Sequence, residues 1–189
     1  MAKYTVEQHF LDTIFSETEL NFQEFESCTF TNCIFSACSF IDVTFIDCTF
    51  TNCTFNKTKI NHVALRTVNF ESCKIVEVNF AMCDRLIFEI TFKNCILDFS
   101  QFYDLNLKET LFTNCSCVAV DFMKANLTAA IFEKCDLYRA EFAQANLSKA
   151  NFASSFNFAI NPKKTKITKA VFSNANVKGL LQHHDIVVQ

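Results

Sequence analysis

An apolar residue, most often phenylalanine, recurs at every fifth position over most of this chain of 189 residues. A first series of fourteen Phe, Leu or Ile residues runs from Phe15 to Phe80. A second series of thirteen runs from Phe92 to Phe152 and is Phe or Leu at every step except Cys117. A period of five matches neither the alternation of a strand nor the 3.6-residue turn of a helix. It indicates a repeat architecture.

A second position, two residues before the centre, is apolar in most units and then is usually Cys, Val or Ala. If each unit of five forms a short extended wall and a corner, both apolar positions can face inward. Four walls then close a coil of about twenty residues, and coils stacked about 4.8 Å apart pair through their backbones. The centres suffice for nearly seven coils, a rod about 30 Å long. The sequence thus predicts an all-β quadrilateral solenoid with these core centres among others: Phe30, Phe50, Phe92, Phe112, Phe122, Phe132, Phe142 and Phe152.

The length and the continuous repeat predict one domain over residues 1–189. Residues 11–80 form its first half-helix, 92–158 its second, and 159–189 a C-terminal cap. Over 81–91 the repeat slips by two residues, and Arg85 falls where a centre is due. We interpret this segment as a bulge or short link, from which Ile87 or Phe88 could protrude.

Eleven cysteines would suggest a disulfide scaffold in a short secreted chain. Ten of them instead keep the register two places before a centre, and Cys117 is itself a centre. This placement favours small buried side chains with free thiols, as in a reducing cytosol. The spacing predicts two columns of stacked thiols, one in each half: Cys33, Cys53 and Cys73, then Cys95, Cys115 and Cys135.

The last thirty residues lose the repeat after two final wall-like pieces at Ile167 and Phe172. Ser173 is a predicted N-cap for a short helix from about Asn174 to His183, followed by a strand at the C-terminus. Because the open end of a solenoid must be covered, this tail is the expected cap and dimer contact. The candidate residues are Leu180, Leu181, Ile186 and Val187.

The net charge of −3 is unevenly spread: residues 1–55 carry eight acids and one base, and residues 160–189 five lysines and one acid. An acidic end can attract a basic partner or a nucleic-acid-binding groove. Glu26 and Asp47 are expected on neighbouring coils of one corner. The full candidate partner surface is Glu24, Glu26, Asp42 and Asp47.

Catalytic and membrane roles find no support in the sequence. No run of 18 apolar residues exists, and the N-terminus lacks the apolar stretch of a signal peptide. The four histidines lie in no catalytic or metal-binding motif, and a single glycine leaves no phosphate loop. We expect no enzyme activity, no cofactor, no metal site, no direct nucleic-acid binding and no membrane association.

The typical unit of five begins with a small residue, continues with Asn, Asp or Glu and then with Leu or Phe, and ends with two polar residues. This pattern resembles the pentapeptide-repeat family. Its clearest copies are Ala125-Asn-Leu-Thr-Ala129 and Ala145-Asn-Leu-Ser-Lys149. The tail from Asn151 to Val188 and the stretch from Ile90 to Leu107 are similar to the albicidin-immunity and quinolone-resistance (Qnr-type) group of that family. The resemblance implies a right-handed quadrilateral β-helix and a cytoplasmic dimer formed through its C-terminal segment.

Two functions follow as hypotheses. The resemblance implies a protein that acts on DNA gyrase or topoisomerase IV by mimicking DNA, giving resistance or immunity to a gyrase poison. The alternative is a scaffold that binds another protein. Its candidate contacts are exposed apolar residues such as Phe88, Phe99, Tyr103 and Tyr138. A continuous acidic stripe along the rod favours the first hypothesis, and a neutral apolar patch favours the second.

Overall fold

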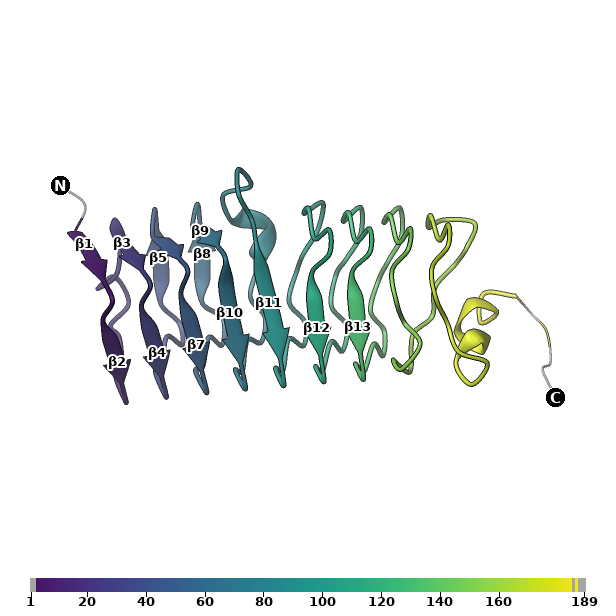
Figure 1. The fold of residues 1–189 in the computed structure, drawn as a ribbon, viewed down its shortest axis with the longest axis horizontal. Coiled ribbons are helices and arrows are strands. Elements are labelled where there is room, and N and C mark those ends of the chain that lie inside the picture. The colour runs from purple at the N-terminus through teal and green to yellow at the C-terminus, as the bar shows by residue number, and fades with distance from the viewer. Residues whose placement is uncertain (1–2, 185, 187–189) are drawn as a thin grey trace.

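The computed structural model describes residues 3–184 and residue 186. The chain winds into a parallel β-helix that forms one elongated rod, with the N-terminus at one end and a small cap at the other (Figure 1). Each turn has four faces, and equivalent residues on successive turns pair side by side. This is the four-walled solenoid that the period of five predicts.

Face 1 is the most continuous ladder, a seven-stranded parallel sheet. Bridges from Ile131 to Asn151 and on to Val171 extend it toward the cap. Its strands, in spatial order, are β2 (His9–Leu11), β4 (Thr29–Thr31), β7 (Thr49–Thr51), β10 (Val68–Glu71), β11 (Ile90–Lys93), β12 (Leu111–Thr113) and β13 (Ile131–Glu133).

The other three faces combine short strands with single bridges. Face 2 is a row of bridges from Ile14 to Phe156. Face 3 begins with β5 (Ser39–Ile41) and β8 (Lys59–Asn61) and continues as bridges from Asn79 to Glu141. Face 4 contains β1 (Lys3–Val6), β3 (Gln23–Glu26), β6 (Thr44–Ile46) and β9 (Ala64–Arg66), then bridges from Asn106 to Lys166. The ladder therefore starts at Lys3, before the expected boundary at residue 11.

The core consists of stacked phenylalanines. All eight named core centres are at most 2 % exposed. On face 1, the Phe112 ring lies parallel to that of Phe132, with centroids 4.7 Å apart. Phe102 and Phe122 stack in the same way on face 3, at 5.3 Å. Rings of the two faces meet edge to face across the interior, as Phe122 and Phe132 do at 5.7 Å, an arrangement that aromatic quadrupoles favour.

The corners place a residue with positive φ two positions after nearly every centre, with Phe15, Phe80 and Phe152 as exceptions. Asn32, Asn52 and Asn94 do so with φ near 54–56°. This region strains most L-residues but suits Asn and Asp. Hydrogen bonds to the next turn offset the strain, since the Asn32 N–H donates to the Thr51 carbonyl at 3.0 Å. The chain therefore turns its corners without glycine.

The position two before a centre holds a small side chain in most units, and where that side chain is Cys, Ser or Thr it can donate a hydrogen bond to the previous turn. Cys53 Sγ donates to the Phe30 carbonyl at 3.3 Å, and Thr58 Oγ1 donates to the Phe35 carbonyl at 2.8 Å. Ser100 and Thr165 repeat this bond. Cysteine therefore serves as a weak donor as well as a small apolar residue. All eleven cysteines are buried and free.

The two predicted thiol columns are in fact one. Phe70 pairs with Phe92 across the slip, so Cys95 stands next to Cys73, and both thiols donate to equivalent carbonyls. The prediction was wrong because it treated the slip as a break in every wall. Faces 1 and 2 pair through the slip, whereas face 4 is interrupted and face 3 has no bridge between β8 and Asn79.

At the slip, the chain projects outward between Asp84 and Glu89, just after the short 3-10 turn η1 (Phe80–Met82) (Figure 1). The N–H groups of Asp84 and Glu89 still donate to the preceding turn. Leu86 at the tip is 80 % exposed and Ile87 protrudes beside it, whereas Phe88 folds back against the core. Arg85 leaves the interior and pairs with Asp104 at 3.0 Å.

The cap is a 3-10 turn, η2 (Val177–Leu180), and not the predicted helix from Asn174 to His183. No side chain caps its start, so Ser173 is not an N-cap. Instead the Asn176 amide donates to the Phe152 and Ser155 carbonyls of the last turn. These bonds tie the segment to the end of the rod. The predicted C-terminal strand lies outside the described residues.

Candidate functional site

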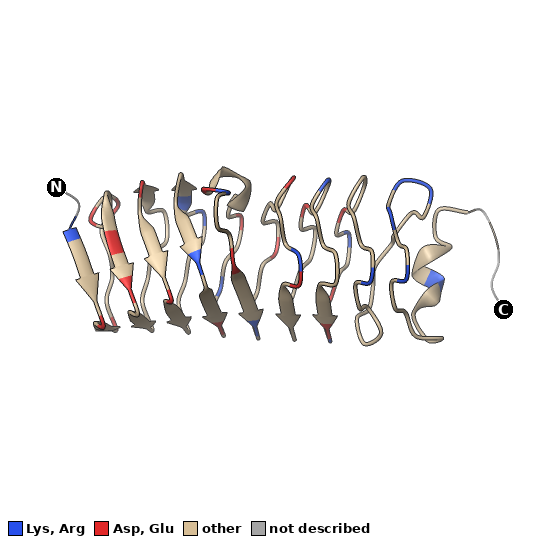
Figure 2. Cartoon of the chain, turned by 45° about the horizontal axis from the view of Figure 1, so that its top comes forward, with Lys and Arg blue, Asp and Glu red and all other residues tan. Residues whose placement is uncertain are grey.

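The four acids predicted as a partner surface lie on one side of the rod, on face 4. Glu24 and Glu26 flank the buried Phe25 on β3 and point outward. Asp42 and Asp47 occupy the corners on either side of β6, the next strand in the sheet. Figure 2 shows acidic residues gathered at this N-terminal end. The structure thus assembles one local acidic patch, defined here as Glu24, Glu26, Asp42 and Asp47.

Neighbouring side chains shape the electrostatics of this acidic patch. The Tyr4 hydroxyl of β1 donates to the Glu26 carboxylate, a contact absent from the sequence-based expectation. That hydrogen bond raises the pKa of Tyr4, and the nearby charges add to the effect. Lys3 on β1 and Arg66 on β9 stand at the two edges of the patch. Its charge is therefore concentrated on β3 and at the two corners that flank β6.

The acidic patch does not continue as a stripe along face 4. Outward positions beyond β9 hold Asn106, Asn126 and Asn146, and then Lys166. On the middle turns, acids pair with bases: Glu71 with Lys93 at 2.7 Å and Glu77 with Lys57 at 3.6 Å. The basic loop and cap lie at the opposite end (Figure 2). The rod is consequently acidic at one end and basic at the other.

The apolar residues considered for the alternative function are dispersed. Phe99 and Tyr138 are 56 % and 49 % exposed. Tyr103 is half-buried beneath Lys124, whose Nζ lies 5.1 Å from the ring centroid. Phe88 packs against the core. The four residues do not form one patch.

The predicted dimer residues occupy the cap. Leu180 packs partly against the core, Leu181 is half-buried, and Ile186 is 56 % exposed. Val187 lies outside the described residues. The cap also carries the single glycine of the chain, Gly179, where an added Cβ would come within 2.4 Å of the Phe158 ring.

Within residues 3–184 and residue 186, no three His, Cys, Asp or Glu side chains are grouped so as to hold a metal ion. The same residues form no helix with the length and apolar character needed to cross a bilayer. Burial raises the pKa of the Cys48 thiol to about 11 and also raises that of Cys83. These two thiols are therefore poor nucleophiles at neutral pH.

The sequence matches the pattern described as the pentapeptide repeat region over residues 23–85 and 86–157. The chain belongs to the pentapeptide-repeat family. A comparison with curated proteins gives no match.

Among solved structures, the chain is similar to HetL, a pentapeptide-repeat protein involved in regulating heterocyst differentiation in the cyanobacterium Nostoc sp. strain PCC 7120. The TM-score is 0.63 at 14 % identity, over 93 % of this chain and 87 % of HetL. It is also similar to full-length QnrB1, a plasmid-mediated fluoroquinolone resistance protein, with a TM-score of 0.51 at 14 % identity, over 97 % of this chain and 100 % of QnrB1. At these identities, the likeness establishes the fold alone.

Proposed function

We propose that this pentapeptide-repeat protein is a non-enzymatic, cytoplasmic interactor of DNA gyrase or topoisomerase IV that gives resistance or immunity to a gyrase poison. The observation that carries the proposal is the acidic patch on β3 and at the corners flanking β6. A groove that binds DNA is basic, and carboxylates held on a rigid strand can occupy it in place of phosphates. The resemblance to Qnr-type proteins and the match in fold to QnrB1 support this choice of partner.

The local extent of the acidic patch restricts the mechanism. Along face 4, the excess of acidic residues is confined to the first turns. We therefore propose that the N-terminal end of the rod enters the DNA-binding groove. Salt screens the electrostatic attraction between unlike charges, with a Debye length of about 8 Å at physiological ionic strength. Binding should therefore weaken as salt is raised.

The test is a gyrase supercoiling assay with the purified protein, with and without a fluoroquinolone. The protein should either inhibit supercoiling or restore it in the presence of the drug. A variant with the acidic patch neutralised should lose the effect; its changes are Glu24→Gln, Glu26→Gln, Asp42→Asn and Asp47→Asn. Asn keeps the corner conformation of Asp, so the rod should remain folded.

A matched control neutralises four acids on other turns: Glu71, Glu77, Glu109 and Glu133. Its effect on gyrase should equal that of the unmodified protein. If the unmodified protein neither inhibits gyrase nor relieves the drug, the proposal fails. Equal loss in both variants would point to net charge and exclude a role for the acidic patch itself.

The second candidate is a scaffold for a different protein partner. The observation in its favour is that the acids form a local patch and not a stripe along the rod. Pull-down with the unmodified protein and the patch-neutralised variant distinguishes the two functions, because capture of a partner other than a type II topoisomerase through the same patch supports the scaffold.

A further inference from the structure

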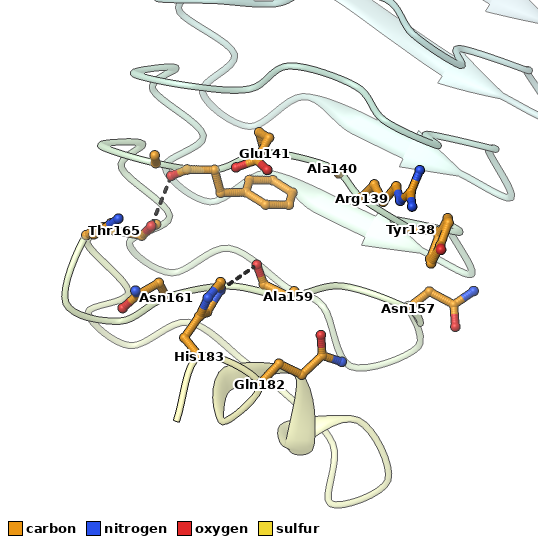
Figure 3. A pocket seen from close by; sticks show the side chains of 13 residues that line it. Tyr138, Arg139, Ala140, Glu141, Asn157, Ala159, Asn161, Thr165, Gln182 and His183 are labelled. Atoms are coloured by element: carbon orange, nitrogen blue, oxygen red, sulfur yellow. Dashed lines mark hydrogen bonds between the residues drawn. The ribbon is translucent and has the colours of Figure 1, made fainter. Parts of the chain in front are cut away.

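A cleft of about 490 Å³ opens on face 3 between the last regular turn and the segment that leads into the cap (Figure 3). One lip is the stretch from Tyr138 to Ala143, and the other is the stretch from Asn157 to Thr165. Gln182 and His183 of the cap close one side. Its volume is typical of ligand sites.

The cleft exists because two successive turns separate on this face alone. In the preceding turn, face 3 is regular: the Ala119 N–H donates to the Tyr138 carbonyl, the Glu141 N–H to the Val120 carbonyl, and the Phe122 N–H to the Glu141 carbonyl. One turn later, the equivalent groups are the Arg139 N–H, the Ala140 carbonyl and the Phe142 N–H. None of these three has a backbone partner among residues 3–184 and residue 186.

The separation has local causes in the second lip. Asn161 and Pro162 begin a tight turn in which the Lys164 N–H donates to the Asn161 carbonyl at 3.0 Å. Proline is common at the second position of such turns. The Ile160 N–H donates to Gly179 in the cap at 3.0 Å. His183 Nε2 lies 3.3 Å from the Ala159 carbonyl. The cap therefore holds the second lip away from the first.

We propose that this cleft receives an extended segment of a partner protein, which adds as a strand along the Arg139–Phe142 edge. A strand offers alternating carbonyls and N–H groups, and the unpaired edge offers N–H, carbonyl and N–H in turn. About four residues of the partner span this edge at roughly 3.3 Å per residue. Recognition of this kind derives its affinity from main-chain hydrogen bonds.

Charge identifies the segment as acidic. Arg139 and Lys164 stand at the cleft against the single carboxylate of Glu141. The Arg139 guanidinium lies over the Tyr138 ring at 5.3 Å, which restrains it at the rim. Residues 160–184 carry five lysines and no acid. Acidic side chains at alternate positions of the bound strand would point toward the Arg139 and Lys164 side chains.

The test uses a fluorescent, end-capped peptide, Glu-Val-Glu-Val-Glu, and fluorescence anisotropy with the full-length protein. The acidic peptide should bind at one site, and the matching Lys-Val-Lys-Val-Lys peptide should bind more weakly. Methylation of the central amide removes the N–H meant for the Ala140 carbonyl and should weaken binding roughly three- to tenfold, the effect of one hydrogen bond. This last peptide separates strand addition from plain charge attraction.

Protein variants locate the site. Arg139→Asn should weaken binding, whereas Lys149→Asn should not. Both residues occupy exposed corners with φ near 60°, which Asn tolerates. The proposal is overturned by absence of binding, by equal affinity for the methylated peptide, or by equal loss in the two variants. It is also overturned if removal of residues 185–189 strengthens peptide binding, since the cleft would then belong to the tail of this chain or of a second copy. None of these outcomes depends on gyrase.

Discussion

At the scale of single residues, the five positions of each unit have separate physical duties. The centre fills the interior, and the residue two before it is small in most units; where it is Cys, Ser or Thr, it can donate to a carbonyl of the previous turn. The residue two after the centre turns the corner with positive φ. The other two positions face solvent. A substitution should therefore have an effect set by its position within the unit.

Phe122→Ala removes a fully buried ring from the face 3 stack. It should lower the free energy of unfolding by about 3–5 kcal/mol, because the tightly packed interior cannot close the cavity. Urea denaturation measures the loss. Phe156→Ala, at an exposed position, is the control and should change stability by less than about 0.5 kcal/mol. A loss below about 1 kcal/mol for Phe122→Ala would contradict a close-packed core.

Phe99→Asn should stabilise the protein. Phe99 is largely exposed and has a φ of 61°, a conformation that costs an aromatic residue more than Asn. We expect a gain of about 0.5–1 kcal/mol in the same denaturation experiment. Phe22→Asn, at a corner with φ 59°, should behave alike. A loss of stability in both would show that these rings make contacts that outweigh their strain.

At the scale of elements, each turn is secured by the one before it, and irregular segments arise where one face loses its partner. At the slip, face 4 is interrupted, and the Arg85–Asp104 pair ties the bulge to the next turn. Faces 1 and 2 keep their register there. At the C-terminal end, face 3 opens because the Asn161–Lys164 turn and the cap draw the chain aside, while faces 1, 2 and 4 keep their bridges.

Gly179→Ala tests how the cap is attached. The new Cβ would lie 2.4 Å from the Phe158 ring and 2.5 Å from its carbonyl oxygen, so η2 must move outward. The Ile160 N–H, which donates to Gly179, should lose protection in hydrogen exchange. Asn174→Ala, on an exposed position of the same segment, should leave this protection unchanged. Full protection in Gly179→Ala would mean that the cap can shift without releasing Ile160.

At the scale of the whole molecule, the rod has two unlike ends and a column of buried thiols through its length. The acidic patch lies near the first turns, and the lysine-rich cap lies at the other end (Figure 2). The column of six thiols from Cys33 to Cys135 continues across the slip without a gap. These properties belong to the stacked assembly, since no single turn has a core of its own.

Stability should fall in alkaline solution. Burial raises the pKa of the Cys48 thiol from 9.0 to about 11, so the unfolded chain loses this proton at lower pH than the native protein does. The stabilisation is complete below about pH 9 and is lost as pH rises through the native pKa. Urea midpoints measured from pH 7 to 11 should therefore decline above pH 9. The Cys48→Ala variant should show a shallower decline, and identical slopes would contradict this assignment.

Deletion of residues 174–189 tests the predicted dimer. It removes η2 and uncovers the end of the stacked core, so the product should be a monomer or insoluble. Size-exclusion chromatography with light scattering gives the mass of both proteins. A dimer that survives the deletion would exclude the cap as the dimer contact.

The repeat, the four-faced architecture and the identity of the buried residues can all be predicted from the sequence. Each of these follows from a local period, because inward and outward positions alternate in the same way on every turn. The positions of Glu26 and Asp47 within the repeat also predicted that both lie on the same side of the rod.

The conformations of the irregular segments follow from contacts that form in the folded protein. The pairing of Phe70 with Phe92 joined the two thiol columns, the return of Phe88 to the core left Leu86 and Ile87 outside, and the Asn176 contacts replaced the predicted helix. The cleft beside Arg139 was likewise unforeseen. In each case the outcome depends on hydrogen bonds and packing between segments distant in sequence, for which a local period carries no information.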